Sequence, residues 1–178
     1  IAGKNHDKLD EVILAFKKKG LKADKLIIDA NNVNSLKEKI DQKAPFDILV
    51  NSIGIAKHSK SSNTNLNDYD HVMNINTKFA YFITQSIANR LISHKKSGSL
   101  INISSQMGHV GGPKRIVYCA TKHAIEGASK AMALELGPYG IRVNTICPTF
   151  IETPMTEGML KEPGFKDLVT SKIALCRV

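Results

Sequence analysis

A strand, a helix and a second strand decide the fold: LINISS at 100–105, YCATKHAIEGASKAMALELG at 118–137 and IRVNTI at 141–146. The first and last stretches are apolar runs of strand length. The middle stretch belongs to a helix that we expect over about residues 116–136, with Gly137 as its stop. Such a βαβ crossover predicts that the two strands lie parallel in one sheet.

The same alternation extends toward the N-terminus. An amphipathic helix is expected over about 7–19, because its apolar residues recur at helical spacing and Gly20 follows. The further elements expected are a strand ending near Ala2, a strand at 26–28, a helix near 35–41, a strand at 48–50 and a long helix near 68–93. Strands and helices in alternation predict one α/β domain over 1–178, with a doubly wound parallel sheet.

Composition narrows the class of protein. The chain has 178 residues, of which 42% are hydrophobic and 23% charged, as is ordinary for one folded domain. Lys and Arg number 25 and Asp and Glu 16, which gives a net charge of +9. No zinc-finger, RNP or basic heptad motif accompanies this charge, so we expect no nucleic-acid partner. A diffuse positive field can still attract anionic partners or phosphorylated cofactors.

Membrane and metal signals are also missing from the sequence. No apolar run approaches the roughly 18 residues of a membrane span, so we expect no membrane partner and a cytoplasmic location. The three cysteines are odd in number and widely separated, which predicts small buried side chains rather than a disulfide framework. The six histidines have no metal-ligand spacing, so no metal site is expected. His109 alone is expected near a substrate.

The predicted strand ends indicate where a ligand binds. In doubly wound sheets the ligand crevice lies outside the carboxyl ends of the strands. Three of these ends carry polar residues or glycine: Asp29, Asn51 with Gly54, and Ser104 with Ser105. We therefore expect the chemistry at this edge of the sheet.

Ser105, Tyr118 and Lys122 form the most informative set of residues. Tyr118 follows Ser105 by 13 positions and opens the predicted helix, and Lys122 lies one turn further on the same face. A phenol with an ordinary pKa of about 10 is a poor base at neutral pH, but a nearby ammonium favours its phenolate form. Tyrosine and lysine at this spacing also occur on solvated helix faces. The strand ending in two serines and the glycine-containing loop 108–112 favour a functional site.

Together these motifs resemble the short-chain dehydrogenase/reductase family, whose fold is Rossmann-like. The residues that carry the resemblance are Asp29, NSIG at 51–54, Met73-Asn74-Ile75, INISS at 101–105, YCATK at 118–122 and IRVNTICPT at 141–149. Three positions depart from the family pattern: Ser52 and Ile53, where the family usually has Asn and Ala, and Thr149, where it usually has Gly. None of these departures removes a group with a catalytic role in the family.

The resemblance implies a role for each matching catalytic position. Tyr118 is expected to be the general acid/base at the substrate oxygen, and Lys122 to lower its pKa and to hydrogen-bond the nicotinamide ribose. Ser105, rather than Ser104, is expected to hold the substrate oxygen. Asn74 is expected to anchor a chain of water molecules that leads to the lysine.

Cofactor-binding positions are implied in the same way. Asp29 is expected at the adenine and the backbones of Asn51 and Gly54 at the adenosine ribose. The remaining implied cofactor positions are Tyr118, Lys122, Pro148, Thr149 and Thr153. The first predicted strand is followed by Lys4, with no carboxylate before Asp7, and a cation there suits the 2′-phosphate of NADP. We therefore expect NADP to be preferred over NAD.

The resemblance also implies more chain than the 178 residues. The family begins with a strand and a glycine-rich turn that binds pyrophosphate, which we expect before Ile1, and it has a terminal strand, which we expect after Val178. The domain is therefore expected to be incomplete at both ends, with a gap in its sheet. The segment after Pro148 is expected to lead into a mobile lid.

The activity implied is NAD(P)-dependent interconversion of a carbonyl and a secondary alcohol in a small-molecule substrate. A 3-oxoacyl thioester reductase and a sugar or polyol dehydrogenase fit equally well. The alternative is a non-catalytic, nucleotide-binding member with a regulatory role, although such members usually lose the tyrosine or the lysine. Pairing of the helices near 68–93 and 116–136 between subunits implies a homotetramer or homodimer.

Overall fold

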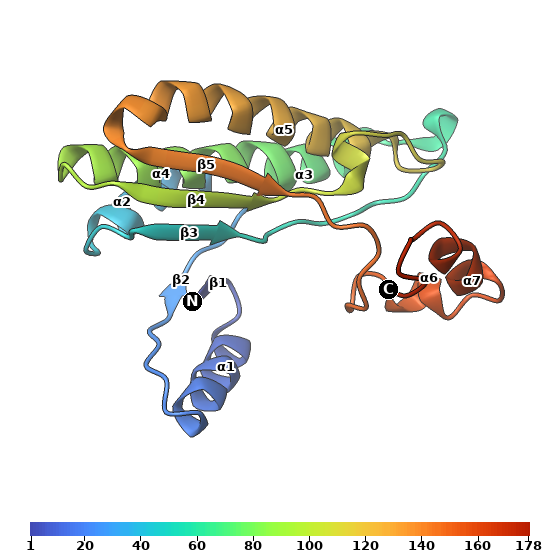
Figure 1. The fold of residues 1–178 in the computed structure, drawn as a ribbon, viewed down its shortest axis with the longest axis horizontal. Coiled ribbons are helices and arrows are strands. Elements are labelled where there is room, and N and C mark those ends of the chain that lie inside the picture. Colours follow the sequence, from blue (N-terminus) through green and yellow to red (C-terminus); the bar gives the residue numbers. More distant parts are fainter.

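The computed structural model describes residues 1–178 and confirms the α/β class (Figure 1). The strands and helices are, in chain order, β1 (Ala2–Gly3), α1 (His6–Lys18), β2 (Leu26–Ile27), α2 (Leu36–Asp41), β3 (Ile48–Asn51), α3 (Leu66–Met73), α4 (Ala80–Ser93), β4 (Gly98–Ile103), α5 (Ile116–Leu136), β5 (Ile141–Ile146), α6 (Glu157–Leu160) and α7 (Phe165–Thr170). A π-helical segment, Asn74–Phe79, joins α3 to α4, and 3-10 turns cover Val33–Ser35, Ser61–Asn63, Gln106–Gly108 and Gly137–Tyr139.

The main sheet has three parallel strands in the order β3, β4, β5. Leu100 of β4 pairs with Leu49 of β3 on one side and with Val143 of β5 on the other. Figure 1 shows α3, α4 and α5 running alongside this sheet. All three strands therefore end at one edge, as the crossover pattern predicts.

A second, two-stranded parallel sheet is formed by β1 and β2, with Ala2 paired to Leu26. In Figure 1 this sheet and α1 lie beyond β3. An apolar cleft separates the two sheets, and Ile1, Leu26 and Ile48 are among the residues that line it. No hydrogen bond joins β1 to β3.

The hydrophobic core lies between the helices and β4 and β5. Leu91 of α4 and Leu100 of β4 are fully buried, and Ile141 of β5 is 1% exposed. Leu36 and Ile40 of α2 belong to the same cluster and extend it toward β2. This packing fixes the positions of the carboxyl ends of the strands, where the polar residues of the predicted site lie.

One helix differs from the sequence prediction. The long helix begins at Leu66 and changes to π-helical geometry over Asn74–Phe79, which helical spacing cannot reveal. The helix over Ile116–Leu136 ends at Gly137 as predicted, and a 3-10 turn then leads to Gly140, whose φ is +71°. Gly20 is a stop as predicted, with φ of +72°. At both Gly20 and Gly140 the chain leaves helical geometry through the left-handed backbone conformation that favours glycine.

The cysteines follow the burial prediction only in part, since Cys119 is buried, Cys147 half-buried and Cys176 exposed. None of the helices combines the length and apolar character that a membrane crossing requires.

Gly98 makes a close approach that a side chain cannot share. A Cβ atom on Gly98 would lie 2.4 Å from Leu91 Cδ1 and 2.9 Å from the Asp47 carbonyl oxygen. We expect Gly98→Ala to lower the free energy of unfolding of the full-length protein by about 1–3 kcal/mol, measured by urea denaturation. Gly127→Ala is the matched control, because open space surrounds Gly127 on α5 and alanine favours helix by about 1 kcal/mol. Equal stabilities of the two variants would contradict this packing.

Candidate active site

Ser105, Tyr118 and Thr149 line one small pocket at the carboxyl edge of the main sheet. Ser105 follows β4, Tyr118 lies in the first turn of α5, and Thr149 follows β5. Phe150, Met155 and Met159 supply an apolar wall to the same pocket. The βαβ crossover thus brings together residues from three segments, because parallel strands end at the same edge.

Lys122 lies beneath this pocket, 6% exposed. Its Nζ donates a hydrogen bond to the Ile103 carbonyl oxygen at 2.9 Å and stands 5.6 Å from the centroid of the Tyr118 ring. Burial lowers the pKa of Lys122, while Cys147 and Glu126 oppose this shift. The predicted proximity of the tyrosine and the lysine is therefore present.

The pKa of Tyr118 differs from the sequence expectation. Burial raises the pKa of the phenol above its ordinary value, and a hydrogen bond with the Ser105 hydroxyl partly offsets this. Desolvation of the half-buried ring is the largest cause of this shift, and the role expected for Lys122 stays a prediction. Ser105, as predicted, is the serine beside the phenol. Ser104 is buried and is not among the pocket-lining residues.

Asn76, rather than Asn74, is the buried asparagine of this cluster, and the role expected for Asn74 stays a prediction. The Asn74 side chain is exposed, whereas that of Asn76 is 2% exposed. Asn76 Oδ1 accepts a hydrogen bond from the Ile55 backbone N–H at 2.8 Å, and Asn76 Nδ2 donates to the Ile55 carbonyl at 2.8 Å. A Cβ atom built on Gly54 would lie 3.6 Å from Asn76 Oδ1 and 3.7 Å from Lys122 Nζ, so both side chains lie beside Gly54.

A signal in the sequence identifies Asn76. Val72, Phe79 and Ile83 are buried at helical spacing, and position 76 falls on the same stripe. Asn74 lies one helical turn from Asp70 and from Lys78, which are both exposed. The π-helical segment begins at Asn74, and such segments are frequent at functional sites.

The predicted adenine end of the site lies on the smaller sheet. Asp29 Oδ1 accepts hydrogen bonds from the backbone N–H and the side-chain amide of Asn31, at 3.0 and 2.9 Å. These bonds, the backbone one foremost, lower the pKa of Asp29, and the charges of Lys4 and Lys39 add to the effect. Lys4 is exposed and has no ion-pair partner within 4.0 Å. Lys4 follows β1 as Asp29 follows β2, so the parallel pairing brings the two together.

The other residues predicted to bind the cofactor are distributed along the carboxyl edge of the main sheet. Asn51 is buried and its Nδ2 donates a hydrogen bond to Asn102 Oδ1 at 2.9 Å, so its side chain links β3 to β4. The Pro148 carbonyl accepts from the Gln106 backbone N–H at 3.0 Å, which ties the exit of β5 to that of β4. Thr153 does not line the pocket of Tyr118, and its hydroxyl lies 3.2 Å from that of Thr156. His109 does not line it either. The chemical roles of all these residues stay predictions.

Comparison with known proteins decides the family. A family model described as short chain dehydrogenase matches residues 1–164. The chain belongs to the short-chain dehydrogenase family. Among its curated relatives are a 3-oxoacyl-[acyl-carrier-protein] reductase of Thermotoga maritima, 35% identical over 152 residues, and a gluconate 5-dehydrogenase of Gluconobacter oxydans, 28% identical over 169 residues. These matches cover 85% and 93% of this chain but 61% and 66% of the two relatives.

The fold of this short-chain dehydrogenase agrees with solved structures. One is a crystal structure of a putative 2-deoxy-D-gluconate 3-dehydrogenase from Agrobacterium tumefaciens with bound NADP, with a TM-score of 0.93 and 34% identity. The match covers 99% of this chain and 70% of that one. The chain thus spans well under the full length of the proteins that it matches.

Asn76 and Asn74 offer a matched pair of substitutions. Asn76→Ala removes the partners of both Ile55 backbone groups, so we expect the free energy of unfolding to fall by about 1–3 kcal/mol. Asn74→Ala alters an exposed side chain and should change it by no more than about 0.5 kcal/mol. Urea denaturation of the full-length variants measures both. A larger loss for Asn74→Ala would refute the placement of Asn76.

Proposed function

We propose that the protein is an NAD(P)-dependent oxidoreductase that interconverts a carbonyl and a secondary alcohol. The observation that carries this proposal is that Ser105 and Tyr118 line one pocket, with the Lys122 ammonium 5.6 Å from the centroid of the phenol ring. Two hydroxyls and a cation suit a substrate oxygen whose proton is gained or lost during the reaction. Membership of a dehydrogenase family supports the same activity.

In this proposal each side chain has a separate task. Ser105 holds the substrate oxygen by a hydrogen bond, and Tyr118 donates a proton to that oxygen in reduction or accepts it in oxidation. Since burial raises the pKa of Tyr118, its protonated form predominates at neutral pH, which suits reduction. Asn76 takes the position that the sequence assigned to Asn74 and holds the backbone of Ile55 beside Lys122.

The donor groups on the sheet edge fit a nicotinamide dinucleotide, which supplies or accepts the hydride when bound. Lys122 uses one of its three N–H donors on Ile103, so two are available for ribose hydroxyls. The exposed Lys4 can meet a 2′-phosphate, which favours NADP over NAD. Several similar solved structures, including a gluconate 5-dehydrogenase from Burkholderia cenocepacia, are described as NADP complexes.

Two substrate classes remain for this pocket. The relatives include reductases of 3-oxoacyl thioesters and dehydrogenases of gluconate, and one L-xylulose reductase. The apolar wall of Phe150, Met155 and Met159 suits an acyl chain, while His58 and Arg115 offer polar contacts to a sugar acid. Assays of the full-length protein with both classes distinguish them.

A non-catalytic, nucleotide-binding regulator is the second candidate. It requires no proton-transfer group, so the presence of Ser105, Tyr118 and Lys122 together argues against it. Self-association as a homodimer or homotetramer remains part of the proposal. It is supported by apolar side chains exposed on α3, the α4 helix and α5, among them Leu66, Phe82 and Leu134.

Tyr118→Phe tests the acid/base assignment. The substitution keeps the ring and removes its transferable proton, so we expect kcat to fall at least about a hundredfold. Affinity for the cofactor should change little. The measurement is nicotinamide absorbance with a carbonyl panel, together with cofactor titration. Tyr139→Phe, at an exposed tyrosine after α5, is the matched control and should leave kcat unchanged. Near-normal turnover of Tyr118→Phe would exclude the assignment.

Lys4→Asp tests the cofactor preference. Replacing the cation by a carboxylate removes a charge-assisted contact to the 2′-phosphate, of about 1.5–3 kcal/mol. We therefore expect the ratio of kcat/KM for NADP to that for NAD to fall about tenfold or more. Lys22→Asp changes the same charge at an exposed position in the loop before β2 and should leave the ratio unchanged. A native enzyme that prefers NAD would show the assignment to be wrong.

A further inference from the structure

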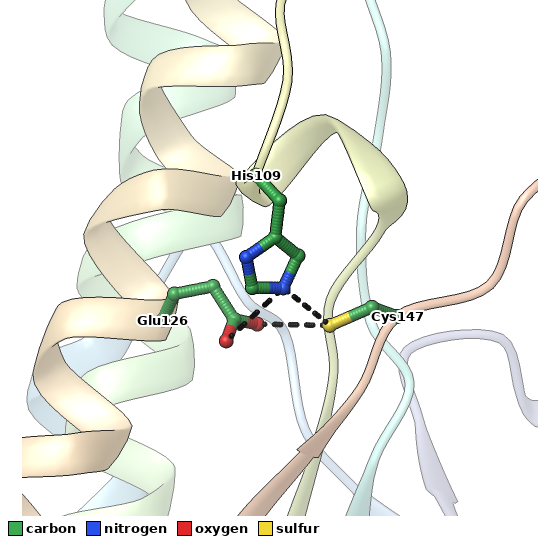
Figure 2. Close-up of side chains that lie close together, drawn as sticks. All are labelled: His109, Glu126 and Cys147. Carbon is green, nitrogen blue, oxygen red and sulfur yellow. Dashed lines mark hydrogen bonds and ion pairs between the residues drawn. The ribbon is translucent and has the colours of Figure 1, made fainter.

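His109, Glu126 and Cys147 form a cluster outside the pocket of Tyr118. His109 lies on the loop after β4, Glu126 on α5 one turn beyond Lys122, and Cys147 directly after β5. Figure 2 shows the three side chains pointing toward one another from these separate segments. Nothing in the proposed oxidoreductase chemistry uses them.

The spacing of their donor atoms is that of a metal site. His109 Nε2 lies 3.3 Å from Cys147 Sγ and 3.6 Å from Glu126 Oε2, and Cys147 Sγ lies 3.2 Å from Glu126 Oε1. Tetrahedral zinc, with bonds of about 2.3 Å to sulfur and about 2.0 Å to nitrogen and oxygen, holds such atoms about 3.3–3.6 Å apart. The distance between His109 and Cys147 fits this spacing. The two distances to Glu126 involve different carboxylate oxygens, and one ligand atom of each residue lies within 4.8 Å of the other two.

The surroundings provide orientation and access. The Glu126 side chain is 7% exposed, and its Oε2 accepts a hydrogen bond from Thr145 Oγ1 at 3.0 Å. Support of this kind orients ligands at metal sites. The His109 side chain is 51% exposed, which leaves a path from solvent.

Ser104 lies beside this cluster. Its buried Oγ makes no hydrogen bond of good geometry, but it is near enough to Glu126 to help lower the pKa of that carboxyl. A Cβ atom on Gly108 would lie 3.0 Å from both Ser104 Oγ and Glu126 Cγ, so the hydroxyl is next to the cluster. A ligand bound to the cluster would lie within reach of this hydroxyl and could hydrogen-bond it.

We propose that His109, Glu126 and Cys147 bind one zinc ion, with a water molecule completing the tetrahedron near Ser104 Oγ. Imidazole nitrogen, thiolate sulfur and carboxylate oxygen together suit zinc, whereas magnesium and calcium prefer oxygen ligands alone. On binding, the thiol proton that Cys147 shares with Glu126 leaves for solvent, the Zn–S bond forms and the ion stays divalent. No oxidant or reductant takes part.

The sequence did not indicate this site, and no metal was expected. Positions 109, 126 and 147 are 17 and 21 residues apart, so no short motif joins them. The βαβ crossover brings them together by placing the loop after β4, the third turn of α5 and the exit of β5 side by side. A bound ion would link the segments that carry Ser105, Lys122 and Pro148.

The test uses purified full-length protein, freed of metal by a chelator. Titration calorimetry with zinc chloride should give one ion per chain, and cobalt chloride should give a thiolate-to-cobalt charge-transfer band. Cys147→Ser should abolish the band, and His109→Gln should weaken zinc binding at least about tenfold. Because His109 is half exposed, His109→Gln keeps the fold, which circular dichroism verifies.

Cys176→Ser and His94→Gln are the matched controls, since both residues are exposed and remote in sequence from the cluster. They should leave the band and the affinity unchanged. Absence of stoichiometric binding would overturn the proposal and would identify the cluster as a hydrogen-bonded network around Glu126. A band lost in Cys176→Ser but kept in Cys147→Ser would overturn it as well. These readouts do not depend on turnover, so the proposed oxidoreductase activity is tested separately.

Discussion

The site depends on one buried hydrogen bond, from Lys122 Nζ to the Ile103 carbonyl at 2.9 Å. A buried ammonium is tolerated only where hydrogen bonds replace those it makes to water. If α5 rotated or slid, this bond would break and the buried charge would have no partner, which is energetically costly. The bond ties the second turn of α5 to the last residue of β4. The Ser105 and Tyr118 hydroxyls, which flank this connection, are thereby held at one place.

A network of buried polar side chains also holds β4 in place against β3, α4 and α5. Asn102 on β4 accepts hydrogen bonds from Asn51 on β3 and from Thr84 on α4, and donates to Ser129 on α5. The three partners lie on three different elements, so each hydrogen bond fixes the position of one element relative to β4. A one-residue slip of a strand would leave these groups unpaired in the core, which makes the register specific.

Local sequence patterns predicted the elements whose signals are strong. The strand–helix–strand unit from β4 to β5 and the grouping of Ser105, Tyr118 and Lys122 follow from apolar runs and helical spacing. The helices α6 and α7 were not predicted, because four and six residues carry little periodicity. Asn76 was missed because apolar periodicity was not extended to polar residues on the buried stripe. The pKa of Tyr118 depends on burial, and the proposed zinc ligands depend on tertiary proximity, so neither is visible in short-range spacing.

The open side of β3 has a consequence for strand pairing. Ile48 and Val50 are 66% and 59% exposed, and the strand has no neighbour beyond them. An apolar edge with free backbone donors and acceptors accepts any extended segment of matching pattern, including the same edge of a second molecule. Residues 48–51 therefore form an apolar edge that suits pairing with a further extended segment.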